Sequence, residues 1–234
     1  KTMKNLKALM MLLIGVFALT ITSCNTDDAD HYYTQEEQDA IQAKMVGTYS
    51  GTLYMYKPNT STQKYEVYHS LPTTWTASKG NPALGKDSLI TISNFPINML
   101  DSAIVISDKD NSDEAKTLRA LRTAISKLPA ENLECKFFVP SDNSYYTFNN
   151  GYRFILNPLI VKKQLTYEEK QHDVYFVFSM NSYVGEWTPG AMNSMKFQMV
   201  FASFSIDKAP QSYYPSFSQK YLRPLIITCG LDKQ

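Results

Sequence analysis

Alternating apolar and polar residues dominate the second half of the chain. From 174 to 180, Val, Phe, Phe and Met alternate with Tyr, Val and Ser, and a similar alternation recurs from 200 to 206. A period of two is typical of a β-strand with one face toward a core. Nine runs read as strands in this way: 47–56, 64–77, 88–92, 133–139, 145–148, 152–161, 173–183, 195–207 and 222–229.

Two segments have the period of an α-helix instead. Thr34 and Glu37 are spaced as a capping box, which predicts a helix from there to about Met45. Apolar residues at steps of three and four predict a second helix over 112–128, ended by Pro129. The first helix offers only a narrow apolar stripe, so we expect it to lie on the surface.

Short connections rich in turn-forming residues separate the strands, which indicates antiparallel pairing. We predict a mainly β fold at the margin of α+β: an antiparallel β-sandwich or a lipocalin-like barrel with about eight or nine strands and two peripheral helices. Pro96 disfavours a central strand over 94–100. We expect that segment to cross the domain end as a plug, and we expect 181–190 to be a loop.

A short leader precedes this domain. Lys4 and Lys7 are followed by an apolar run over 8–21, whose 14 residues match a signal peptide and are too few to span a bilayer. The run ends in Ile21-Thr22-Ser23-Cys24, which resembles the lipobox of bacterial lipoproteins. The resemblance implies cleavage before Cys24 and a lipid anchor on it. An ordinary secretory signal with a chance cysteine is the alternative.

Acidic residues follow the cysteine at Asp27, Asp28 and Asp30. This cluster resembles the surface-export signal of Bacteroidetes lipoproteins, and solvated tether residues are the alternative. The chain then divides into a signal peptide over 1–23, an acidic tether over 24–33 and one β-rich domain over 34–234. The expected location is the outer membrane, anchored by lipid and facing the cell surface.

The domain as a whole resembles an uncharacterised family of lipoproteins from gut Bacteroidetes. The matching features are the capped helix and three short motifs: Gly47-Thr48-Tyr49-Ser50-Gly51, Ile92-Ser93-Asn94-Phe95-Pro96 and Met180-Asn181-Ser182-Tyr183. The resemblance implies a fold and a location, and it adds no catalytic residues.

Charge and cysteine content narrow the functional classes. A formal net charge of +1 without a basic stripe indicates that nucleic acid is not a partner. Cys135 and Cys229 remain once Cys24 is lipidated. They could form a disulfide, which the compartment permits, or they could be buried thiols that behave as small apolar residues.

Catalytic motifs are missing from the sequence. His31, His69 and His172 lack a second histidine at a metal-binding spacing, so we predict no metal site and no cofactor. Cys135 with His172, or Asp173 with Glu186, could serve a hydrolase, although nothing in the sequence brings either pair together. We therefore assign no catalytic residue.

Aromatic residues in or beside turns are the feature that a binding function could use. They can stack on sugar rings or anchor a peptide, and the alternative is that they cover the ends of the core. The candidates are Tyr145, Tyr146, Trp187, Tyr213 and Tyr214.

These observations favour a lipid-anchored, non-enzymatic binding lipoprotein whose ligand is a glycan fragment, a peptide or a small apolar molecule. A structural lipoprotein that docks to an outer-membrane protein complex is the second hypothesis, and a hydrolase is the third. A partly empty core would favour ligand binding, whereas a filled core with an apolar surface patch would favour docking.

Overall fold

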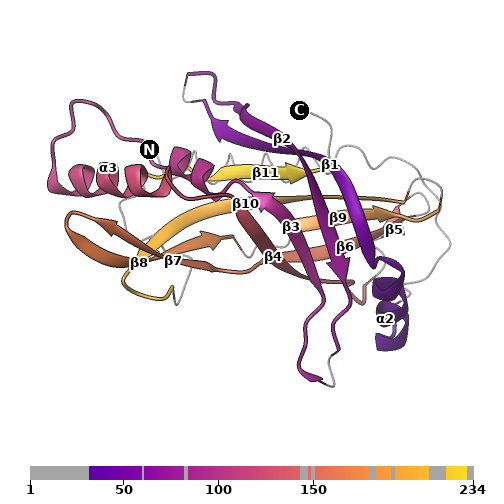
Figure 1. The fold of residues 1–234 in the computed structure, drawn as a ribbon. Helices are drawn as coiled ribbons and strands as arrows, with labels where there is room; N and C mark the ends of the chain where they lie inside the picture. Colours follow the sequence, from indigo (N-terminus) through magenta and orange to yellow (C-terminus); the bar gives the residue numbers. More distant parts are fainter. Residues whose placement is uncertain are drawn as a thin grey trace. The chain divides into compact units, whose positions relative to one another are not determined.

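Eight antiparallel strands close into a barrel in the structure, which is a computed structural model (Figure 1). It describes residues 32–59, 61–81, 84–142, 147–148, 151–179, 183–190, 193–210 and 220–230. The barrel strands are β1 (Gly47–Pro58), β2 (Tyr65–Ser78), β3 (Leu89–Phe95), β4 (Glu131–Phe138), β6 (Gly151–Pro158), β9 (Tyr183–Thr188), β10 (Ser194–Ile206) and β11 (Leu225–Cys229). The mainly β prediction is confirmed, and the barrel is the architecture found.

Strand β10 closes the barrel and extends beyond it. Its first residues pair with β9, the middle of the strand pairs with β11, and its last residues pair with β8 (Lys170–Phe178). Strand β8 in turn pairs with β7 (Val161–Tyr167), which ends the sheet. A short strand, β5 (Thr147–Phe148), pairs with β6. The β7–β8 hairpin is therefore an extension of the barrel sheet.

Three helices accompany the sheet in the described part of the chain: α2 (Gln35–Lys44), the 3₁₀ helix η2 (Ile97–Ala103) and α3 (Asp113–Ile125). The predicted capping box is present in α2, where the Glu37 amide donates to the Thr34 hydroxyl over 3.2 Å. Helix α3 lies at the same end of the domain as the β7–β8 hairpin (Figure 1). None of these helices has the length and apolarity to cross a membrane.

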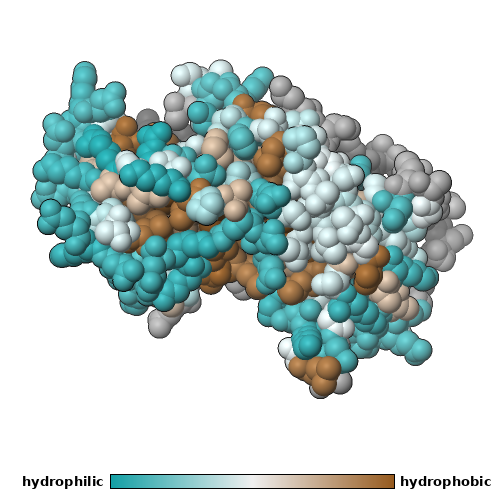
Figure 2. All heavy atoms as spheres, viewed as in Figure 1, coloured by the Kyte–Doolittle hydropathy of each residue, from teal (hydrophilic) through white to brown (hydrophobic). Residues whose placement is uncertain are grey.

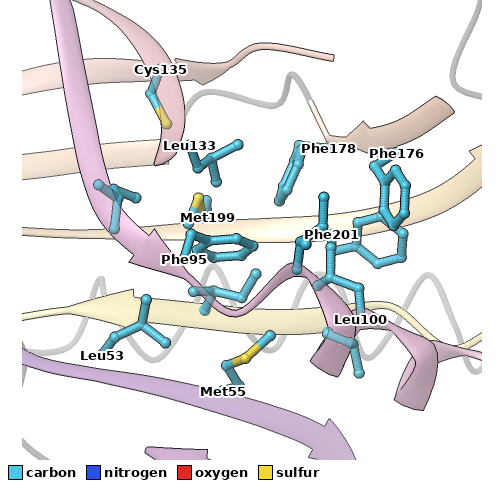
Figure 3. Close-up of a cluster of buried hydrophobic side chains, with 14 of the residues drawn as sticks. Leu53, Met55, Phe95, Leu100, Leu133, Cys135, Phe176, Phe178, Met199 and Phe201 are labelled. Carbon is cyan, nitrogen blue, oxygen red and sulfur yellow. The ribbon is translucent and has the colours of Figure 1, made fainter. Parts of the chain in front are cut away.

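Side chains fill the barrel interior. Trp75 packs edge-on against Phe197 with ring centroids 5.6 Å apart, and Phe137 packs similarly against Phe154 at 5.9 Å. Figure 3 shows Phe95, at the end of β3, among side chains from β8 and β10. The predicted insertion of Phe95, Ile97 and Leu100 into the core is confirmed, because each is at most 1% exposed. Phe95 is the last residue of β3, and the other two lie in η2.

The same core continues outside the barrel under α3. The helix buries its apolar stripe completely, with Ala115, Leu118, Leu121 and Ile125 at 0% exposure. On the hairpin, Phe176 of β8 packs against Phe204 of β10, with ring centroids 5.2 Å apart. Helix α3 and the β7–β8 hairpin therefore form a second layer that shares one core with the barrel.

The described residues contain more strands than the nine runs predict. The predicted loop over 181–190 holds β9, and the run 152–161 is divided into β6 and the start of β7. Gly185 explains the first error. A Cβ at this position would overlap the ring of Phe154, so the glycine serves close packing inside a strand and does not mark a turn.

We predict that Gly185→Ala destabilises the barrel by about 1–3 kcal/mol, because the added methyl forces the Phe154 ring out of its packed position. Val184→Thr on the neighbouring, outward-facing residue is the control and should change stability by less than about 0.5 kcal/mol. Urea unfolding followed by tryptophan fluorescence measures both. Equal stability of the Gly185 variant and the wild type would contradict this packing.

Candidate ligand-binding groove

An open groove of about 490 Å³ runs between α3 and β7 on the outside of the barrel. Figure 2 shows a pale and brown strip on the left between two teal surfaces, in the region where Figure 1 places α3 and the hairpin. The volume lies within the range of small-ligand sites. The groove is lined by Arg119, Ala120, Thr123, Ala124, Lys127, Gln164, Leu165, Thr166 and Tyr167.

Helix α3 supplies one wall through a stripe along its length. Arg119, Ala120, Thr123 and Ala124 follow one another at steps of one and three, and Lys127 continues the stripe just past the helix end. The two alanines leave an apolar floor, whereas Arg119 and Lys127 place positive charge roughly two helical turns apart. This wall can therefore contact an apolar surface and an anion at the same time.

Strand β7 supplies the other wall through four consecutive residues, 164 to 167. Successive side chains of a strand point to opposite faces, so a groove over one face would be lined by alternate residues. Lining by consecutive residues indicates that the groove follows the edge of the strand. That edge is unpaired by any strand of the described part, because β7 is the last strand of the sheet.

Polar contacts hold the two walls in place. Arg119 donates through Nη2 to the carbonyl oxygens of Ser107 and Asp110, at 2.9 and 2.6 Å. The Thr117 hydroxyl of α3 donates to the Glu168 carboxylate at 3.0 Å, next to the end of β7. The lining itself contains two cations and no carboxylate, which favours an anionic ligand over a cationic one.

The start of α3 is fixed by a separate cluster. The Tyr221 hydroxyl donates to the Asp110 carboxylate at 2.7 Å, and the backbone N–H of Ser112 donates to the same carboxylate at 3.1 Å. These hydrogen bonds to the charged form lower the pKa of Asp110. The cluster ties the segment before α3 to the segment before β11, and a structural role accounts for it.

Tyr167 of the groove lining contacts His172, which in turn contacts Asp207. Tyr167 stacks on the His172 ring with centroids 4.3 Å apart, and His172 Nδ1 is 2.8 Å from Asp207 Oδ2. The hydrogen bond with His172 lowers the pKa of Asp207, and burial raises the pKa of Tyr167. Among the described residues, the buried His172 Nε2 and Tyr167 Oη have no hydrogen-bond partner.

Sequence reasoning did not find this groove or the contact of His172 with Asp207. His172 and Asp207 are 35 positions apart, and only the pairing of β8 with β10 brings them together. The lining residues of α3 and β7 are ordinary for a helix and a strand, and no motif marks them. The one usable signal was the solvent-facing stripe of α3 that contains two alanines.

Most of the predicted ligand contacts cannot be compared with the structure. Tyr145, Tyr146, Tyr213 and Tyr214 lie outside the described residues, as do Ile21 to Cys24 and the acidic residues Asp27, Asp28 and Asp30.

The remaining candidate, Trp187, is 3% exposed. It stacks on Tyr152 with centroids 5.8 Å apart, and its Nε1 donates to Asn193 Oδ1 at 3.3 Å. This position fits the alternative that the aromatic residues cover the end of the core, and ligand contact by Trp187 stays a prediction.

The two cysteines are free, fully buried thiols in the structure, as in the alternative of small apolar residues, and the proposed disulfide is not present. Burial raises the pKa of both thiols, which works against a thiolate nucleophile.

Neither pair considered for a hydrolase is brought together. Cys135 is a fully buried residue of β4 in the core (Figure 3), whereas His172 is on β8 of the hairpin and is hydrogen-bonded to Asp207. Asp173 pairs with Lys162 at 2.6 Å, and Glu186 pairs with Arg153 at 3.7 Å. Within the described ranges, no three His, Cys, Asp or Glu residues are grouped as metal ligands.

Comparison with known proteins identifies a family. A family described as a domain of unknown function (DUF4840) matches residues 44–206, and because this is most of the chain, the chain belongs to that family. The matched span includes both walls of the groove and ends with β10, so β11 lies outside it. No curated protein and no solved structure matches the chain.

We predict that Asp207→Asn destabilises the hairpin end of the domain at neutral pH, because it weakens the hydrogen bonds to His172 and to the Asp173 amide. The folded pKa of Asp207 is lowered, so its stabilising effect is present above its ordinary value near 3.8 and is lost as the pH falls through the lowered value. Urea unfolding at pH 7 and pH 3 measures the difference between variant and wild type, which should shrink at pH 3.

Asp108→Asn is the matched control, because Asp108 is exposed in the turn before α3. Its effect should be small at both pH values. A difference between the Asp207 variant and the wild type that grows on acidification would contradict the assigned role.

Proposed function

We propose that this protein is a lipid-anchored, non-enzymatic binding lipoprotein of the outer membrane that faces the cell surface and binds its ligand in the groove between α3 and β7. The anchor and the location rest on the sequence, through the lipobox at Ile21 to Cys24 and the acidic residues that follow it. The ligand site rests on the geometry of the groove. The ligand class is a glycan fragment or a peptide that carries negative charge.

One observation carries the placement of the site: the barrel interior is occupied by side chains and the open groove is outside it. Lipocalin-like barrels that bind small apolar molecules hold them inside. Here Trp75, Phe95, Phe154 and Phe197 are each at most 1% exposed and take up that space. A small apolar ligand in the core is therefore the least favoured of the three ligand classes, and the cationic, partly polar groove favours the other two.

Docking to an outer-membrane protein is the second candidate function, and an apolar row on the barrel wall favours it. Phe138 of β4 is paired with Ile155 of β6, which is paired with Val184 of β9. Phe138 and Val184 are 41% and 37% exposed. Two exposed apolar side chains with the partly buried Ile155 between them form an apolar row across three neighbouring strands, which is a feature of protein-binding surfaces, and a filled core is compatible with such a role.

We predict that Cys24→Ala abolishes membrane attachment, because the acyl chains on this residue supply the anchoring free energy. In cells fed labelled palmitate, the wild-type protein should carry the label and the variant should not, and the variant should leave the membrane fraction. Cys135→Ala is the control and should keep both label and membrane attachment. Continued labelling of the Cys24 variant would refute the anchor.

The same cells test the orientation. Protease added to intact cells should digest the wild-type domain as it does after lysis. If the domain survives on intact cells and is digested only after lysis, the surface-facing part of the proposal is wrong.

We further predict that ligand binding depends on the charge of Lys127 in the groove lining. On arrays of acidic and neutral oligosaccharides and peptides, the wild-type protein should retain acidic probes, and Lys127→Glu should weaken that retention at least fivefold by replacing attraction with repulsion. Lys116→Glu is the matched control, because Lys116 is exposed on another side of α3 and pairs with Asp113. Equal retention of acidic probes by the two variants would contradict ligand binding in the groove.

A further inference from the structure

We infer that the groove takes an extended, acidic peptide, which adds to the free edge of β7 as one more strand of the sheet. This inference rests on the proposed function and names the ligand class of the same site. It follows from the hydrogen-bonding pattern of the hairpin, the dimensions of the groove and the distribution of charge around it.

The hairpin determines which backbone groups of β7 are available. Strands β7 and β8 are joined by Glu168 and Glu169, whose φ angles are 50° and 60°, as a two-residue hairpin turn requires. In such a hairpin the closing pair, Tyr167 and Lys170, exchanges hydrogen bonds, and every second pair along the ladder does the same. The N–H and C=O groups of Lys162, Gln164 and Thr166 therefore point away from β8, toward the free edge.

The groove has the shape that a partner strand needs. Its β7 wall is four consecutive residues, about 10 Å of extended chain, and its α3 wall spans from Arg119 to Lys127, about 12 Å along a helix. A segment of about four extended residues matches these lengths. An edge strand facing a helix is an established arrangement for peptides that bind by strand addition, with main-chain hydrogen bonds on one side and side-chain contacts on the other.

Charge around the groove selects an acidic peptide. Lys127 is exposed and forms no ion pair with a described residue, while Arg119 lies at the other end of the helix wall. Lys162 and Lys163 of β7 are already paired with Asp173 and Glu131. Glu168 and Glu169 lie beyond the Arg119 end of the groove, whereas Glu131 at the other end is paired with Lys163, so we expect the most acidic part of the peptide to lie near Lys127.

Edge strands are also places where proteins prevent unwanted pairing, often with lysines or with a covering helix. Lys162, Lys163 and α3 could serve only that purpose here. Under this alternative the backbone edge would remain closed to added peptides, and any acidic ligand would contact side chains alone. The two cases differ in whether the backbone of β7 takes part.

The probe is a fluorescein-labelled hexapeptide of alternating Glu and Thr, added to the full-length protein in detergent. We expect saturable binding by fluorescence anisotropy, no binding of the matching Lys and Thr peptide, and about fivefold weaker binding to Lys127→Gln than to Lys116→Gln. Amide hydrogen exchange followed by mass spectrometry should show slower exchange in residues 161–167 with the peptide bound, and no change in residues 65–78.

N-methylation of the probe tests the backbone directly. Alternate N–H groups of a strand point to opposite sides, so methyl groups on the three Glu nitrogens and on the three Thr nitrogens block opposite edges of the peptide. One methylated series should lose at least tenfold in affinity, and the other should bind nearly as well as the parent peptide. Equal effects of the two series, or unchanged exchange in β7, would overturn strand addition.

The outcomes separate this inference from the proposed function. If acidic oligosaccharides bind in a Lys127-dependent manner and the hexapeptide does not bind, the peptide inference is wrong and the binding function stands. If no acidic probe of either class binds, both are wrong. Binding of the hexapeptide with protected β7 amides and a one-sided effect of N-methylation supports both.

Discussion

Pairing of β10 with three different strands is the constraint on which the rest of this fold depends. Residues near Ser194 pair with β9, those from Phe197 to Phe201 pair with β11, and those up to Ile206 pair with β8. The first two sets of hydrogen bonds close the barrel, and the third holds a hairpin outside it. Because one strand makes all three ladders, the position of the hairpin relative to the barrel is determined by the backbone of β10.

Aromatic side chains of β3, β8 and β10 join the barrel and the hairpin in one hydrophobic core. Phe201 of β10 packs against Phe178 and Phe176 of β8 at 5.6 and 6.3 Å, and Phe178 packs against Phe95 at the end of β3 at 6.3 Å. Close-packed side chains of the described residues occupy the interior of the barrel. The ligand site that we propose therefore lies on the outer surface, where α3 and β7 leave a groove.

Sequence patterns predicted what depends on neighbouring residues and missed what depends on pairing. The capping box of Thr34 and Glu37, the apolar stripe of α3 and the insertion of Phe95 into the core all follow from local spacing, and the structure confirms them. Strand β9 was not predicted because glycine is a typical turn residue. Gly185 instead lies within the strand, where it makes room for the Phe154 ring. The groove was missed because Arg119 and Gln164 come together only through the packing of α3 on β7, for which periodicity holds no signal.

The ends of the groove are held by contacts that do not involve its lining. At one end, Thr117 of α3 donates to Glu168, in a turn where two non-glycine residues have positive φ. A positive φ at a non-glycine residue destabilises the backbone by roughly 1–2 kcal/mol, so contacts around this turn must stabilise its conformation. At the other end, Lys163 of β7 pairs with Glu131 at the start of β4. These contacts restrain the hairpin on either side of residues 164–167 and keep the edge of β7 alongside α3, with its hydrogen-bonding groups in a fixed row.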